Sequence, residues 1–187
     1  MPTQTEIGAR DKVMLTLLLH TGLRLQEFIQ LQLKDVDLTA RQLTVRQGKG
    51  AKDRTLPLSQ AIATQVQNYI KQLRPAFLKV PSEALFLSKK GRPFHPTAFR
   101  EKIYFYAKKA GLHDRRVYPH TFRSTFATLL VRQAGADLTV IKELMGHTNI
   151  QTTARYVRVV EAEKRKAVEE VITSSIILSV LDRGIYK

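Results

Sequence analysis

A change of hydrophobic period in the first third of the chain limits its fold most strongly. Between Val36 and Leu58, apolar residues alternate with polar ones in short runs separated by turns at 37–41 and 48–53. This alternation is typical of strands that bury one face, and short turns join antiparallel neighbours. Elsewhere the apolar residues mostly recur at the spacing of helices. The sequence therefore predicts a mainly α fold with a small antiparallel three-stranded β-sheet, in the α+β class.

The helical segments have recognisable starts and stops. Ser59 and Asp137 fit N-caps, Pro75 marks an expected helix end, and Gly146 follows another one. We expect helices at 9–20, 25–33, 60–75, 99–110, 121–132, 138–145 and 150–159. The first of these is apolar on most sides but far too short to span a membrane.

The charge balance favours one kind of partner. Among 187 residues, 31 are Lys or Arg and 16 are Asp or Glu, which gives a formal charge of +15. Such an imbalance favours a polyanion, and nucleic acid is the obvious one. The competing interpretation is a basic protein that has no such partner.

Length and composition set further bounds. The chain suits one globular domain, residues 1–187. It has no cysteine, so disulfides and thiolate metal sites are excluded and a reducing compartment is permitted. The polar residues 1–12 lack the apolar core of a signal peptide. We therefore expect a cytoplasmic protein with no membrane partner.

The run Tyr118–Val157 gathers side chains that handle phosphate. His120 and Arg123 lie three positions apart, so on a helix they share a face. His147 follows a helix end, and Tyr156 comes nine positions later. Two imidazoles, a guanidinium and a phenol are the groups needed to attack a phosphodiester without a metal.

Two basic turns could contact a DNA backbone. The hairpin sequence GKGAKDR and the later turn KKGRP both place cations beside glycine. A polar loop that happens to be basic is the alternative for each. The expected DNA contacts are Lys52, Arg54, Lys89, Lys90 and Arg92, while Lys49 of the first turn is considered separately.

Five motifs, in order, resemble the catalytic domain of the tyrosine recombinases, the phage integrase and Xer-like group. They are TGLR at 21–24 with Glu27, GKGAKDR at 48–54, HTFR at 120–123, LMGH at 144–147, and Tyr156. The resemblance covers residues 9–159 and implies a mostly helical domain with a small sheet.

The resemblance also implies a chemistry at phosphate. Tyr156 matches the nucleophile that forms a 3′-phosphotyrosine and releases a 5′-hydroxyl. Arg24 and Arg123 match the arginines that grip the scissile phosphate, where rigid guanidinium forks can neutralise the charge of the transition state. Because the arginines supply that charge, neither a metal nor a cofactor is expected.

The remaining catalytic positions are implied in the same way. Lys49 resembles the general acid that protonates the departing 5′-oxygen. His120 matches a residue that contacts phosphate and assists proton transfer from the tyrosine, and His147 a second donor to phosphate. Glu27 is expected to orient a neighbouring side chain.

The chain departs from the family pattern in two places. Ser124 follows Arg123 where many relatives have His, and few residues precede the first helix, so no separate N-terminal core-binding domain is expected. Residues 160–187 form a charged segment and then an apolar one. The apolar segment either docks on a neighbouring protomer, as in a tetramer on double-stranded DNA, or folds back on its own domain.

Several classes of function therefore remain. The resemblance favours a site-specific recombinase or integrase, with a type IB topoisomerase-like enzyme or a non-catalytic DNA-binding module as alternatives. A metal-dependent nuclease is disfavoured, because the histidines show no close ligand spacing and no carboxylate cluster accompanies them. The histidines are His20, His95, His113, His120 and His147.

Overall fold

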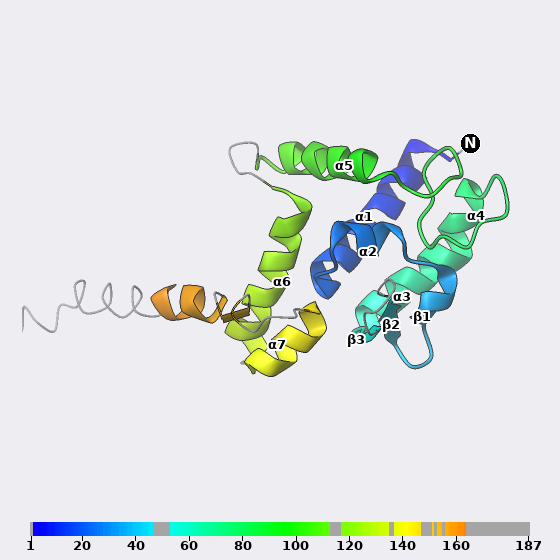
Figure 1. Ribbon diagram of the computed structural model, residues 1–187. Helices are drawn as coiled ribbons and strands as arrows, with labels where there is room; N and C mark the ends of the chain where they lie inside the picture. Colours follow the sequence, from blue (N-terminus) through cyan, green and yellow to red (C-terminus); the bar gives the residue numbers. More distant parts are fainter. Residues whose placement is uncertain are drawn as a thin grey trace, which may run out of the picture.

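The computed structural model shows a mainly helical domain with a small sheet at one edge (Figure 1). It describes residues 2–46, 53–112, 117–134, 137–146, 151, 153, 154 and 156–163. The described elements are α1 (Gln4–Thr21), α2 (Leu25–Ile29), a 3-10 turn η1 (Leu33–Asp35), β1 (Val36–Asp37), β2 (Gln42–Val45), β3 (Arg54–Pro57), α3 (Gln60–Asn68), a π-helical turn η2 (Tyr69–Leu73), α4 (Arg74–Phe77), α5 (Pro96–Lys109), α6 (Pro119–Ala134) and α7 (Leu138–Met145). Residues 156–163 are also helical.

The predicted fold class is confirmed. The sheet has three strands in the order β1-β2-β3, and both pairings are antiparallel. Leu43 faces Leu56 across the second pairing, and both side chains are buried, as the alternation predicted. Strand β1 has only two residues, and strands β2 and β3 have four each, so most of the regular structure is helical.

Helix α1 lies at the centre of the domain. It packs against α3 and η2 on one side and against α6 on another. Leu17 and Leu18 are fully buried, and Phe28 of α2 stacks between Phe86 and Phe99. This core holds the C-terminal end of α1 and the start of α2 in fixed positions. No described helix has the length and apolar character that crossing a membrane requires.

A second, smaller apolar cluster joins α6, α7 and the last described helical residues. Its buried members are Ala127, Ile141, Met145 and Tyr156. Figure 1 shows α7 and this segment beside the lower part of α6, and α7 also contacts β3. The cluster therefore connects the last described part of the chain to the main body.

Some element ends differ from the sequence expectation. Helix α1 begins at Gln4 rather than at residue 9, because Thr3 and Glu6 form a capping box. Pro75 does not end its helix but lies in the first turn of α4, directly after the π-helical turn η2. Because proline lacks a backbone N–H, it cannot donate one of the hydrogen bonds that a regular α-helix requires, and the wider π-helical turn before it accommodates this loss.

Two glycines with positive φ end the helices that lead to the candidate site. Gly22 has φ 58° at the end of α1, and Gly146 has φ 62° at the end of α7. A Cβ on Gly22 would lie 2.4 Å from Phe126 Cδ1 of α6. Both the backbone conformation and the close approach of α6 therefore require glycine at this position.

Replacing Gly22 by alanine tests this requirement. We expect Gly22→Ala to lower the free energy of unfolding by about 2 kcal/mol or more, because the left-handed conformation alone costs roughly 1–2 kcal/mol. The matched control is Gly8→Ala, within α1, where a Cβ meets nothing within 4 Å. That variant should gain about 0.5–1 kcal/mol. Chemical denaturation followed by circular dichroism measures both, and a Gly22→Ala protein as stable as the control would contradict the requirement.

Candidate active site

Arg24 begins α2 immediately after the Gly22 turn and is held by that helix's own first turn. Its backbone amide donates to Glu27 Oε2 at 2.8 Å, and its Nη1 donates to Glu27 Oε1 at 2.9 Å. Its Nη2 donates to the carbonyl oxygen of Gly146 at 3.0 Å. The side chain remains 46% exposed, so it can still accept an anion from solvent.

Arg123 reaches the same place from α6 but is buried. Its Nη1 donates to the carbonyl of Gly22 at 2.7 Å, and its Nη2 donates to the carbonyl of Met145. Burial, followed by the nearby charge of Arg24, lowers the pKa of Arg123 to about 10, which leaves it charged at neutral pH. The side chain thus ties the ends of α1 and α7 together while it carries a positive charge.

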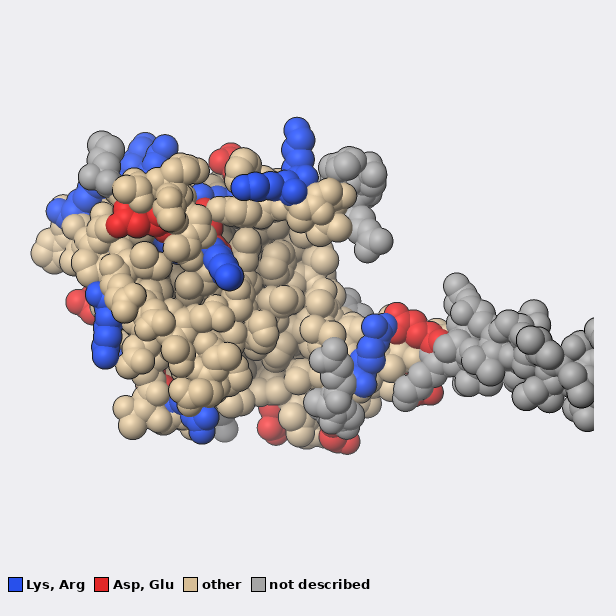
Figure 2. Space-filling view, turned by 180° about the vertical axis from the view of Figure 1, so that it is seen from behind, with Lys and Arg blue, Asp and Glu red and all other residues tan. Residues whose placement is uncertain are grey.

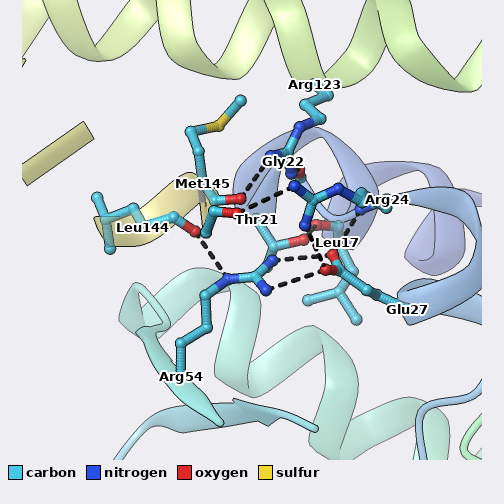
Figure 3. A network of polar contacts seen from close by, with 10 residues as sticks. Leu17, Thr21, Gly22, Arg24, Glu27, Arg54, Arg123, Leu144 and Met145 are labelled. Carbon is cyan, nitrogen blue, oxygen red and sulfur yellow. Dashed lines mark hydrogen bonds and ion pairs between the residues drawn. The ribbon is translucent and has the colours of Figure 1, made fainter. Parts of the chain in front are cut away.

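Glu27 lies between two arginines, as Figure 3 shows. Besides Arg24, it receives both terminal nitrogens of Arg54, at 3.0 and 2.8 Å. Burial raises the pKa of Glu27, but hydrogen bonds from Arg54 and the backbone amide of Arg24, with the charge of Arg54, outweigh it and lower the pKa from 4.5 to about 2. The carboxylate therefore stays ionised and orients Arg24, the role expected of it.

The positively charged groups meet at a cavity of about 300 Å³. His120, in the first turn of α6, lines it together with Arg24 and Arg123. The turn before α6 is fixed by the backbone amide of Tyr118, which donates to Thr121 Oγ1 at 3.1 Å. Residues that are far apart in sequence are thus brought to one cavity.

Tyr156 lies outside the lining of this cavity. It is only 4% exposed, within the apolar cluster formed by α6 and α7. That cluster includes Met145, whose carbonyl accepts a hydrogen bond from Arg123. The phenol is therefore a neighbour of the arginine cavity but not part of the cavity lining.

The other predicted residues have varied positions. Lys49, Lys52 and His147 lie outside the described residues. The exposed side chains of the second basic turn line a separate cavity of about 670 Å³, between the start of α1 and α5; they are Lys89, Lys90 and Arg92.

Arg54 differs from its neighbours in the basic hairpin. The expected projection toward DNA does not hold for its side chain, which is 10% exposed and paired internally with Glu27. On the face of the molecule shown in Figure 2, Lys and Arg side chains are spread singly over a mostly uncharged surface. The positive charge is therefore not gathered into one patch on that face.

Arg100 and Tyr104 of α5 also line the cavity of about 300 Å³, and neither was among the site residues expected from the sequence. They are four residues apart on one helix face, beside the buried positions Phe99 and Ile103. A basic and an aromatic residue at that spacing could have indicated them. Among the described residues, no group of three or more His, Cys, Asp or Glu could hold a metal ion.

Solved structures of recombinases share this fold. XerA recombinase matches with a TM-score of 0.70 and 28% identity, over 88% of this chain and 64% of that one. The XerH site-specific recombinase in its pre-cleavage complex with difH substrate matches with a TM-score of 0.72 and 26% identity, over 87% of this chain and 47% of that one. The fold is therefore that of tyrosine recombinase catalytic domains.

The sequence comparison agrees. Residues 1–163 match the phage integrase family, and the chain belongs to that family of tyrosine recombinases. It is 39% identical to tyrosine recombinase XerD of Staphylococcus saprophyticus over 164 residues and to XerD of Staphylococcus aureus over 160 residues. These matches cover 87% and 85% of this chain but 55% and 53% of those proteins, so the chain spans about half the length of its curated relatives.

The ionised state of Glu27 gives a pH-dependent prediction. Because folding lowers its pKa from 4.5 to about 2, its contribution to stability is present above pH 4.5 and is lost as the pH falls toward 2. We expect Glu27→Gln to cost about 2 kcal/mol at neutral pH, as for a hydrogen bond to a charged group, and much less at pH 3. Denaturant unfolding at both pH values measures this. The control is Glu143→Gln, at an exposed position of α7, and an equal loss for Glu27→Gln at both pH values would contradict the assignment.

Proposed function

We propose that this chain is the catalytic part of a site-specific DNA recombinase or integrase that cuts and rejoins strands through a 3′-phosphotyrosine. The observation that supports this best is the cavity lined by Arg24, His120 and Arg123, with Tyr156 in the apolar cluster of Met145, whose carbonyl binds Arg123. The relatives are recombinases, and one is seen bound to its DNA substrate. We place such a protein in the cytoplasm, where DNA is accessible, whether it is encoded by a bacterium, an archaeon or a phage.

In the proposed reaction, the two arginines bind the non-bridging oxygens of the scissile phosphate. Tyr156 Oη attacks phosphorus, the bond from phosphorus to the 5′-oxygen breaks, and a tyrosyl ester to the 3′-phosphate forms. The developing phosphorane gains negative charge, which positively charged donors fixed in advance stabilise. Because Arg24 and Arg123 are already held by carbonyls and by Glu27, little reorganisation is needed.

Proton transfers complete the step. His120 lies at the cavity, where it can accept the proton of the phenol and donate a hydrogen bond to phosphate. We assign Lys49 as the acid that protonates the departing 5′-oxygen, and His147 as a further donor to the phosphate. The reverse step, with a 5′-hydroxyl of another strand, reseals the DNA without ATP, since the ester retains the energy of the original bond.

We further propose that Lys52, Lys89, Lys90 and Arg92 contact the DNA backbone. The last three are exposed on one turn, as phosphate contacts must be. When the logarithm of the DNA-binding constant is plotted against the logarithm of salt concentration, each lost phosphate contact should reduce the magnitude of the slope by about one.

Covalent capture of DNA tests the proposed reaction. The protein is mixed with nicked duplexes whose central segment is randomised, so that cleavage beside the nick releases a short fragment and traps the ester. We expect an adduct that survives denaturing electrophoresis and chelator. Sequencing of the captured DNA identifies the site.

The control for that capture is Tyr156→Phe, which lacks only the attacking hydroxyl. It should form no adduct and bind the captured duplex with an affinity near that of the wild type. An adduct in Tyr156→Phe, or its absence from the wild type on every duplex in the library, would exclude the proposed chemistry. Rejoining to a second duplex, rather than relaxation of supercoils alone, separates a recombinase from a topoisomerase.

Assembly is the second part of the proposal. An apolar groove of about 220 Å³ lies between α1, β3, α6 and α7. Its lining includes Leu56, Ile62, Phe126, Leu130 and Leu144. The apolar segment 171–181 of a second copy has the chemistry to fill it, and such head-to-tail exchange closes a ring, here a tetramer on DNA.

Removing residues 171–187 tests this assembly. We expect the full chain to sediment as an oligomer on the captured duplex and the shortened chain to bind the same duplex as separate protomers. Leu130→Asp within the groove should have the same effect, because a buried charge without a partner opposes docking. Identical sedimentation of all three proteins on DNA would refute docking between copies.

A further inference from the structure

Arg54 makes contacts that link three separate parts of the candidate site. It lies at the start of β3, directly after the hairpin that carries Lys49. Both of its terminal nitrogens bind the carboxylate of Glu27, which in turn holds Arg24. Its Nε donates to the carbonyl of Leu144 at 3.1 Å, near the end of α7.

The packing around this guanidinium is tight. Arg54 Nη1 would lie 2.8 Å from a Cβ built on Gly146, so the arginine lies against the turn that ends α7. That turn also offers its carbonyls at 145 and 146 to Arg123 and Arg24. A displacement of Arg54 would therefore shift the acceptors of both phosphate-binding arginines, together with the backbone that leads into His147.

The use of its donors also distinguishes Arg54 from a phosphate ligand. Its Nε donates to the carbonyl of Leu144, and both terminal nitrogens donate to the carboxylate of Glu27, which neutralises its charge. Arg123 is also buried, but its terminal nitrogens donate to neutral carbonyls, and Arg24 remains 46% exposed. A guanidinium whose two terminal nitrogens already pair with a carboxylate cannot offer that same edge to a phosphate.

We propose that Arg54 is a positioning residue for catalysis rather than a contact to DNA. It anchors the catalytic hairpin, Glu27 and the end of α7 to one another, so that Arg24 and the segment before His147 take their working positions together. This inference rests on the proposed strand-transfer function, because it assigns a role within that site.

The two roles differ in what they change. A phosphate contact contributes to affinity and to its salt dependence, so its loss lowers the slope of binding against salt by about one. A positioning residue leaves that slope intact and slows the chemical step, because a displacement of about 1 Å can cost roughly 100-fold in rate.

The experiment compares Arg54→Gln with two other variants of the full chain. Binding to a fluorescent duplex of random sequence is measured over a range of salt, and adduct formation is timed at saturation on the duplex captured by the wild type. For Arg54→Gln we expect an unchanged slope and an adduct rate lower by about 100-fold. Lys90→Gln, which removes an exposed cation, should lower the slope by about one.

Arg46→Gln is the control for the loss of an ion pair between an arginine and a buried carboxylate. Arg46 follows β2 in the same hairpin, and its Nε contacts Asp35 Oδ1 at 2.7 Å, with the Asp35 side chain 4% exposed. This pair includes neither of the phosphate-binding arginines, so the adduct rate should stay within about twofold of the wild type. Thermal melts confirm that each variant is folded at the assay temperature.

A double variant, compared with its two single variants, tests whether Arg54 acts through Glu27. If it does, the double variant Glu27→Gln with Arg54→Gln should react no more slowly than the worse single variant, since both changes break one unit. A lowered salt slope in Arg54→Gln, or a folded Arg54→Gln that reacts at the wild-type rate, would overturn the positioning role. Failure of the wild type to form any adduct would instead reject the proposed function.

Discussion

The site depends on one electrostatic constraint, which is that guanidinium groups of like charge, those of Arg24 and Arg123, must be held together at one cavity. The structure meets this constraint with the carbonyl oxygens that end two helices. Gly22 and Gly146 turn the chain in the left-handed conformation, and the carbonyls around these turns accept from Arg24 and Arg123. Helix C-termini carry partial negative charge, so α1 and α7 both stabilise the cations.

The helix N-termini are placed in the complementary way. Arg24 is the N-cap of α2, and His120 lies in the first turn of α6. The positive ends of these helices therefore accompany the side chains that line the cavity, where a phosphate would be bound. The packing of α1, α2, α6 and α7 therefore places the arginine side chains near helix C-termini and the cavity near helix N-termini.

Sequence reasoning predicted the architecture well because hydrophobic period is a local signal. The alternation from Val36 to Leu58 identified the sheet, and the glycine at 146 identified a helix end. Pro75 shows the limit of such local rules. A proline ends a regular α-helical ladder, but a π-helical turn before it lets the chain continue, and no short sequence pattern specifies that turn.

The sequence predicted the site residues that belong to motifs with a known chemistry. It predicted less well those residues whose direction is set by packing. Arg24, His120 and Arg123 were chosen as phosphate ligands and do line one cavity. Arg54 was grouped with the basic turn because neighbouring residues are cationic. Arg54 and Leu56 are two positions apart in β3, so their side chains lie on the same face of the strand. Leu56 on that face is buried. The period of the strand thus carried the signal that Arg54 points inward.

The balance of charge then explains why an arginine is needed at that position. Glu27 fixes the geometry of Arg24, but a carboxylate alone beside a phosphate would repel it. Arg54 offsets that charge from the side away from solvent, so the formal sum of the network is set by Arg24 and Arg123. Two uncompensated positive charges match the total charge of the dianionic phosphorane that forms from a phosphodiester monoanion. The buried ion pair thus lets the site combine rigid orientation of Arg24 with a net positive field.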